Sequence, residues 1–132
     1  MPITLPSLRH ADRLYIDGAW VPPLQDTRRI DVTDSSTGQV FLSVAEALHA
    51  DVHRAIAAAR RAFDDGPWPR LTHEERAAWL AAIGQAVGGF SEEMADAWSG
   101  EVGIVRSAAG AVLGGVPGTY NRYAELATTF PF

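Results

Sequence analysis

The spacing of apolar residues changes near residue 50, and this change constrains the fold more than any other feature of the sequence. Val40, Leu42 and Val44 alternate with other residues, which is the period of a strand with one apolar face. From Asp51 onward, apolar residues recur every three or four positions, the period of an amphipathic helix. The sequence therefore predicts an α+β fold, with strands first and about four helices after them.

The region with strand signals covers residues 13–44 and follows a loose tail at residues 1–12 that contains two prolines. Near its start, Asp17 and Gly18 form a dipeptide that supplies the positive φ angles of a tight hairpin turn. A later run rich in Ser, Thr and Asp separates two further strands. The helical region is predicted over residues 49–132.

The first helix is predicted by a single apolar stripe and a clear stop. Gly66 and Pro67 follow an acidic pair and end the helix. The stripe consists of Val52, Ile56, Ala59 and Phe63.

Two further helices follow. Thr72 and Glu75 fit a capping box at the start of the second helix. Ser91 is expected to cap a short third helix, and Gly100 and Gly103 bracket the break after it. The apolar stripe of the second helix consists of Trp79, Ile83 and Val87.

The last helical segment, about residues 105–127, contains Pro117. A proline inside a helix costs about 3 kcal/mol, so we expect a kink or two helices there. Gly110, Gly114 and Gly118 recur at intervals of four, a spacing that favours the close approach of another backbone.

Two residue types are absent from the 132 residues: cysteine and lysine, all eleven cations being arginines. Without cysteine there is no disulfide, thiolate nucleophile or cysteine-ligated metal. Without lysine there is no Schiff-base amine and no P-loop lysine. Any chemistry on this chain must therefore use histidines, carboxylates, hydroxyls or an outside group.

The net charge and the hydropathy of the sequence limit the kinds of partner that the chain can bind. The net charge of −5 argues against a general nucleic-acid binder. The longest nearly apolar stretch, residues 77–90, falls short of the ~20 residues that span a bilayer. Because the sequence contains no disulfide-forming residue and no visible signal peptide, we expect a cytoplasmic protein.

Local motifs do not reveal an active site. His73 and Glu74 begin a zinc-protease pattern, but Ala77 stands where its second histidine is required. A polar first turn of a capped helix explains these residues, and a zinc hydrolase would require stoichiometric zinc. The glycines at 110–118 match no nucleotide-binding loop. The remaining histidines are expected to face solvent, and these are His10, His49 and His53.

Several segments carry a family resemblance in colinear order. They are residues 14–21, 34–40 and 51–63, Trp68 with Arg76, residues 101–103, and Tyr123 with Ala124. Together they resemble the N-terminal part of the NAD(P)-dependent aldehyde dehydrogenases. Ser35 replaces the usual proline of the family's N-P-x-T-G-E-V turn, and Ile104 replaces a frequent lysine.

The resemblance implies a fragment of a larger α/β enzyme that oxidises an aldehyde to a carboxylic acid with NAD or NADP. In that family the catalytic cysteine, the general-base glutamate, the cofactor-contacting lysine and the glycine-rich nucleotide segment all lie downstream of the matching part. We therefore expect no catalytic or cofactor-binding residue in this chain. Alone, it is predicted to be inactive and to bind no cofactor.

Only peripheral roles transfer by resemblance. Glu101, with backbone oxygens near Val32 and Thr33, matches a monovalent cation site of the family. Ala111 and Gly115 fall on the helix that lines the family's substrate tunnel. The family has an unbroken helix there, and the proline noted above departs from it.

Two hypotheses of different kinds follow. In the first, the chain is the N-terminal portion of an aldehyde dehydrogenase, whether a truncated gene product, a fragment or one part of a split enzyme. Its partner is then the missing C-terminal catalytic portion. In the second, the chain is a non-catalytic interaction module that self-associates through exposed apolar faces. Neither hypothesis involves a nucleic acid or a membrane.

Overall fold

The computed structural model describes residues 8–25 and 28–131. These residues form two compact units, which we call the strand unit, residues 8–69, and the helical unit, residues 70–131. Residues 1–7 of the predicted tail lie outside the described residues. The α+β class predicted from the sequence is confirmed, with four α-helices and two antiparallel strand pairs among the described residues.

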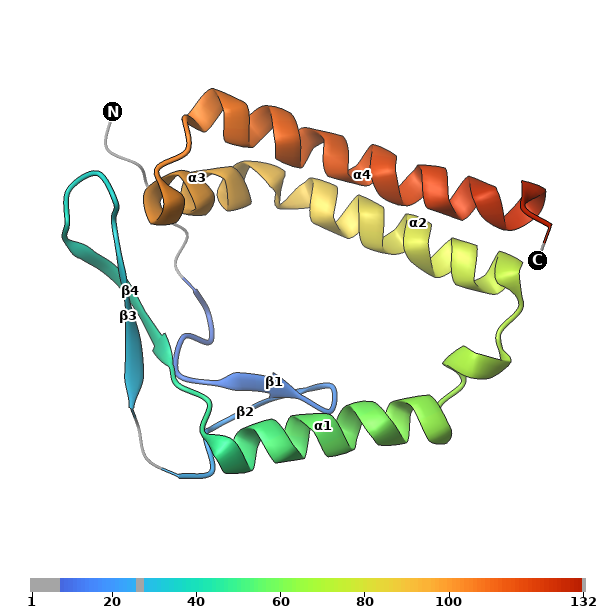
Figure 1. Cartoon of the computed structure of the whole chain (residues 1–132), viewed down its shortest axis with the longest axis horizontal. Coiled ribbons are helices and arrows are strands. Elements are labelled where there is room, and N and C mark those ends of the chain that lie inside the picture. The colour runs from blue at the N-terminus through green and yellow to red at the C-terminus, as the bar shows by residue number, and fades with distance from the viewer. Residues whose placement is uncertain (1–7, 26–27, 132) are drawn as a thin grey trace. The chain divides into compact units, whose positions relative to one another are not determined.

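The strand unit begins with a short hairpin (Figure 1). Strands β1 (Leu14–Ile16) and β2 (Ala19–Val21) pair antiparallel, with Tyr15 opposite Trp20. Between them Asp17 has φ 57° and Gly18 has φ 77°, the left-handed conformation that this turn requires. The predicted hairpin is therefore confirmed.

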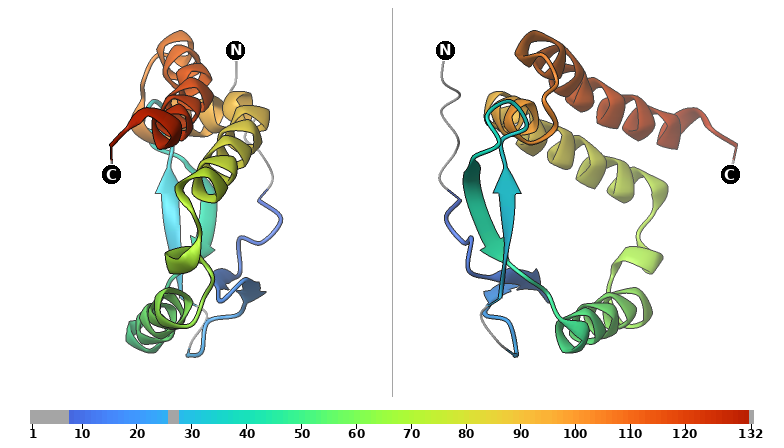
Figure 2. Two further views of the ribbon diagram at one scale, coloured as in Figure 1. Left: turned by 90° about the vertical axis from the view of Figure 1, so that its right-hand side faces the viewer. Right: turned by 60° about the vertical axis from the view of Figure 1, so that its left-hand side comes forward.

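A second, longer strand pair follows (Figure 2). Strand β3 (Arg29–Thr33) pairs antiparallel with β4 (Val40–Ala45), and the register shifts between Val32 and Thr33. Such a β-bulge bends the strand and redirects its side chains. The predicted turn between these strands is also confirmed, because Gly38 donates its N–H to the carbonyl of Asp34.

Helix α1 (His49–Asp64) completes the strand unit and packs against β1 through a face of small residues. Ala58 on this face is buried, as is Ile16 of β1. Of the apolar stripe predicted from the sequence, Ala59 lies toward the hairpin, whereas Val52, Ile56 and Phe63 are exposed. The stripe marks apolar surface, but within the described residues alanines make the packing contact.

The helical unit contains α2 (His73–Gly89), α3 (Ser91–Val102) and α4 (Arg106–Thr129), preceded by the short 3-10 helix η1 (Trp68–Arg70) at the unit boundary. The views agree that α4 runs back along α3 and α2 (Figures 1 and 2). The capping box at the start of α2 is confirmed: Thr72 and Glu75 each accept the other's backbone N–H.

The termini of α3 differ from the prediction. Ser91 is the first residue of α3, and its hydroxyl donates to the carbonyl of Gly88, so it does not cap the helix. Gly100 lies inside α3, and only Gly103 ends it, with φ 78°. A left-handed residue after the last turn of a helix favours glycine, whereas a glycine within a helix can simply allow close packing.

Helix α4 is one helix with Pro117 inside it, so of the two predicted alternatives, a kink or two helices, the division into two is excluded. Packing along α2 and α3 offsets the cost of the proline. Within the described residues, no other backbone approaches the α4 glycines closely, contrary to the prediction. At Gly114 and Gly118 a Cβ would meet no described atom within 4 Å, and at Gly110 it would meet only the side chain of Arg106.

Among the described residues, no helix combines the length and the apolar character that a membrane crossing requires.

Candidate functional site

The outer face of α4 is the surface on which the predicted substrate-tunnel residues lie. Ala111 and Gly115 are four residues apart, so they share one face of the helix, and both are exposed. A Cβ built on Gly115 would meet no described atom within 4 Å. The two residues therefore form an open, shallow strip of helix surface.

The opposite face of α4 packs against α2 at two glycines. A Cβ on Gly84 would lie 2.9 Å from the Cβ of Tyr120 and 3.4 Å from the carbonyl oxygen of Pro117. A Cβ on Gly88 would lie 3.0 Å from the Cγ of Pro117. These glycines let the helices approach closely and hold the outer face of α4 in place. Sequence reasoning missed them, although their spacing of four residues was visible.

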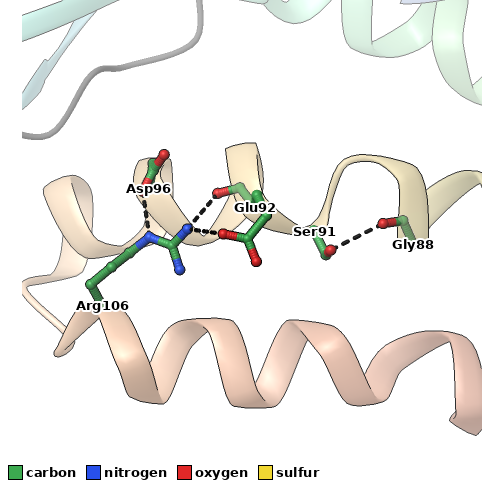
Figure 3. Close-up of polar contacts among 5 residues, drawn as sticks. All are labelled: Gly88, Ser91, Glu92, Asp96 and Arg106. Atoms are coloured by element: carbon green, nitrogen blue, oxygen red, sulfur yellow. Dashed lines mark hydrogen bonds and ion pairs between the residues drawn. The ribbon is translucent and has the colours of Figure 1, made fainter.

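Arg106 fastens the first turn of α4 to α3 (Figure 3). Its guanidinium donates a hydrogen bond to the carboxylate of Asp96. It also donates to Glu92, to the side-chain carboxylate at 2.6 Å and to the backbone carbonyl at 3.2 Å. These hydrogen bonds raise the pKa of Arg106, and the bond to Asp96 contributes the most. A cation at a helix N-terminus opposes the helix dipole, so the two acids compensate for its position.

Helix α3 carries Glu101, the acidic member of the predicted cation site, and this residue is exposed. The nearby Ser99 is buried, and its hydroxyl has no hydrogen-bond partner among the described residues. Glu101 belongs to the helical unit, whereas Val32 and Thr33 belong to the strand unit. The cation site stays a prediction from resemblance.

Val32 and Thr33 lie at the end of β3, where the bulge precedes a tight turn. The carboxylate of Asp34 accepts the Ser36 hydroxyl at 2.6 Å and the Ser36 N–H at 2.7 Å. These hydrogen bonds favour the ionised form and lower the pKa of Asp34. The turn that follows the bulge is therefore well ordered by its own side chains.

A shallow apolar groove of about 310 Å³ lies between the β1–β2 hairpin and α1. Its charged lining residue, Asp17, pairs with Arg61 at 2.9 Å. The groove is lined by Tyr15, Ile16, Asp17, Gly18, Ala55, Ala58, Ala59 and Ala62. It lacks the converging polar groups that orient a small substrate.

The described residues contain no cluster of metal-ligating side chains of the usual size. No group of three or more His, Cys, Asp or Glu residues among them could hold a metal ion. His73 lies in the first turn of α2, so the zinc-hydrolase hypothesis finds no ligand set there.

Comparison with known proteins gives a consistent result. The model of the aldehyde dehydrogenase family matches residues 20–131. The mitochondrial benzaldehyde dehydrogenase of Antirrhinum majus is 35% identical over 99 residues, which cover 74% of this chain and 18% of that protein. The betaine aldehyde dehydrogenase of Bacillus subtilis is 31% identical over 114 residues, 86% of this chain and 23% of that protein.

Solved structures agree. Betaine aldehyde dehydrogenase from Staphylococcus aureus, in complex with NAD+, superposes with a TM-score of 0.81 at 29% identity, covering 89% of this chain and 23% of that chain. NAD-dependent aldehyde dehydrogenase from Sinorhizobium meliloti gives a TM-score of 0.79 at 32% identity. The match covers 87% of this chain and 23% of that chain. The chain thus spans about a fifth of the length of the relatives it matches.

Proposed function

The chain belongs to the aldehyde dehydrogenase family, and on that premise we propose that it is the N-terminal segment of an enzyme that oxidises an aldehyde to a carboxylic acid with NAD or NADP. The observation that carries the proposal is the family match over residues 20–131. The segment supplies structural support and a wall of the substrate passage. The reacting groups come from elsewhere.

The chemistry explains why other residues are needed. Aldehyde oxidation of this type uses a thiolate that attacks the carbonyl carbon, a donor that stabilises the resulting oxyanion, and a base that activates water. The sequence contains no cysteine. The thiolate must therefore be supplied by additional aldehyde dehydrogenase chain, in the same polypeptide or in a separate one.

We also assign the nicotinamide cofactor to residues outside this chain. A dinucleotide site of the Rossmann type needs parallel strands and a glycine-rich turn that leads into a helix. Within the described residues both strand pairs are antiparallel, β1 with β2 and β3 with β4. The proposal therefore assigns NAD or NADP binding to chain beyond these residues and expects none from this chain alone.

The outer face of α4 is the part that we assign to the substrate. Ala111 and Gly115 present almost no side-chain bulk, and both are exposed. A wall of small residues leaves room for the body of a bulky aldehyde. Two contacts would keep this wall at a fixed position. They are the packing of α4 on α2 and the hydrogen bonds of Arg106 to Asp96 and Glu92, which we call the Arg106 clamp.

Exposed apolar side chains support the need for more protein. In the strand unit, Ile56 is 60% exposed and Phe63 is 61% exposed. In the helical unit, Trp79 is 58% exposed. Contiguous exposed apolar surface often marks a site where other protein packs. We assign the cover to the remaining aldehyde dehydrogenase chain. A second candidate function, self-association as a non-catalytic helical module, draws on the same observation.

Activity measurements test the first function. The purified 132-residue chain is expected to form no NADH or NADPH from benzaldehyde or betaine aldehyde above a heat-denatured control. Turnover above that control would overturn the assignment of the reacting groups to other chain.

Light scattering separates the two candidates. The self-association function predicts an oligomer that persists on dilution. A stably folded, strictly monomeric chain would count against it and leave the first function standing.

A further inference from the structure

We propose that His49 and His53 form a two-histidine chelate for a divalent transition-metal ion on the exposed face of α1. The proposal rests on the geometry of this one helix. It holds whether or not the chain is part of an aldehyde dehydrogenase.

The two rings share a helix face. They stand four residues apart in α1, so their Cβ atoms are neighbours on the helix surface. Their ring centroids are 4.4 Å apart, with 65° between the ring planes. Small side-chain rotations can bring one nitrogen of each ring to a shared ion, at the usual distance of about 2.0–2.1 Å.

Both rings are accessible and uncommitted. His49 and His53 are exposed, and neither ring makes a hydrogen bond or ion pair with the residues that the structure describes. The face of α1 that packs on the hairpin carries Ala55 and Ala58 instead. Metal binding would therefore change the contact between the two rings but displace no described hydrogen bond or ion pair of the strand unit.

The donor set indicates the class of ion. Imidazole nitrogens suit Cu²⁺, Ni²⁺ and Zn²⁺, with Cu²⁺ bound most tightly. The adjacent Asp51 is occupied, since its carboxylate accepts the N–H groups of Leu24 and Leu48. No described third ligand completes a larger cluster. The site therefore keeps open positions for water and is expected to bind with moderate affinity.

The sequence contains a contrasting histidine. His73 also lies on an exposed helix turn, but Ala77 stands four residues after it. A single imidazole lacks the increase in metal affinity that comes from linking two ligands. This increase reaches about 10²-fold or more. His73 is thus a natural control within the same chain.

Calorimetric titration of the full chain with Ni²⁺ at about pH 7.5, where free imidazole is mostly neutral, tests the proposal. We expect one Ni²⁺ per chain. His49→Ala and His53→Ala should each weaken binding by about 10²-fold. His73→Ala should leave the affinity unchanged. With Cu²⁺, electron paramagnetic resonance should show two nitrogen ligands in the natural chain and at most one in each of the same two variants.

A composition-matched variant sharpens the test. His53→Arg combined with Arg54→His keeps every residue type but moves the second ring to the fifth position, on another side of the helix. It should bind Ni²⁺ as weakly as His53→Ala, while circular dichroism confirms that α1 is intact. The proposal is overturned if the exchange variant binds as tightly as the natural chain, or if the natural chain binds no Ni²⁺.

Discussion

The strand unit and the helical unit are stabilised in different ways. In the helical unit, α2 and α4 meet at Gly84 and Gly88, and the fully buried residues include Ala95 and Ala109. In the strand unit, the buried carboxylate of Asp51 holds backbone N–H groups from two separate loops. The α2–α4 contact of the helical unit thus depends on close packing at glycines, whereas the loops of the strand unit are joined by hydrogen bonds to one buried carboxylate. Adding side-chain volume should therefore destabilise the helical unit, and removing a hydrogen-bond acceptor should destabilise the strand unit.

The largest effect is expected from Gly84→Leu. The new side chain would begin 2.9 Å from the Cβ of Tyr120 and force α2 away from α4. Overpacking of this kind costs about 3 kcal/mol of the free energy of unfolding. Chemical denaturation followed by circular dichroism measures it.

The control is Gly114→Ala, in α4 but with no described atom within 4 Å of its Cβ. It should stabilise the helix by about 0.5–1 kcal/mol. If both variants lost stability equally, close packing at Gly84 would not be what holds the helical unit.

The next effect is expected in the strand unit. Asp51→Ala removes the acceptor of the N–H groups of Leu24 and Leu48 and should cost about 2 kcal/mol. Asp51→Asn keeps one acceptor oxygen and should cost less. Asp12→Ala, at an exposed carboxylate, should change little. Equal stabilities of the three variants in denaturant would show that the buried carboxylate is not a main support.

A smaller effect is expected at the hairpin turn. Gly18 has φ 77°, which a side chain with a Cβ tolerates poorly, so Gly18→Ala should cost about 1 kcal/mol. Gly118→Ala, in a helix with open space around it, is the matched control and should be neutral or stabilising. A neutral Gly18→Ala would mean that the turn conformation contributes little to the strand unit.

The smallest effect concerns pH. The pKa of Asp34 is lowered below its ordinary value near 3.8, chiefly by the Ser36 hydroxyl. The folded state therefore gains stability from this carboxylate at pH values above the unfolded pKa. That gain is lost as pH falls through the lower, folded pKa. Asp34→Asn should unfold more easily than the natural chain near neutral pH, and the difference should shrink below about pH 4. A difference independent of pH would exclude the charge as its cause.

Much of the local structure could be predicted from the sequence, because it depends on neighbouring residues. The Asp17-Gly18 turn and the capping box of Thr72 and Glu75 are examples, and both are confirmed. The order of strands and helices followed from apolar periodicity together with turn, stop and capping residues.

The packing could not be predicted in the same way. Periodicity identifies an apolar face but not what covers it, so the stripes with Ile56 and Trp79 were found on exposed surface. The glycines of α4 attracted attention, whereas Gly84 and Gly88 of α2 make the close contact. Which of two glycine faces packs depends on the partner helix and its proline, and this is tertiary information.

For the candidate site, too, the sequence predicted what local motifs determine but not what packing between helices determines. The family could be identified from colinear motifs, and the family match confirms it. The structure shows that Ala111 and Gly115 lie on one exposed face of α4, whereas their role in a substrate passage remains a proposal. No local pattern predicted the Arg106 clamp, because its partners lie 10 and 14 residues away on another helix.

The most direct test of the central claim is to read the coding sequence beyond the codon for residue 132 and the genes beside it. The account predicts a continuation, in frame or as an adjoining partner gene, that encodes the remaining aldehyde dehydrogenase chain with a catalytic cysteine and a dinucleotide-binding segment. A stop codon followed by unrelated genes would contradict it.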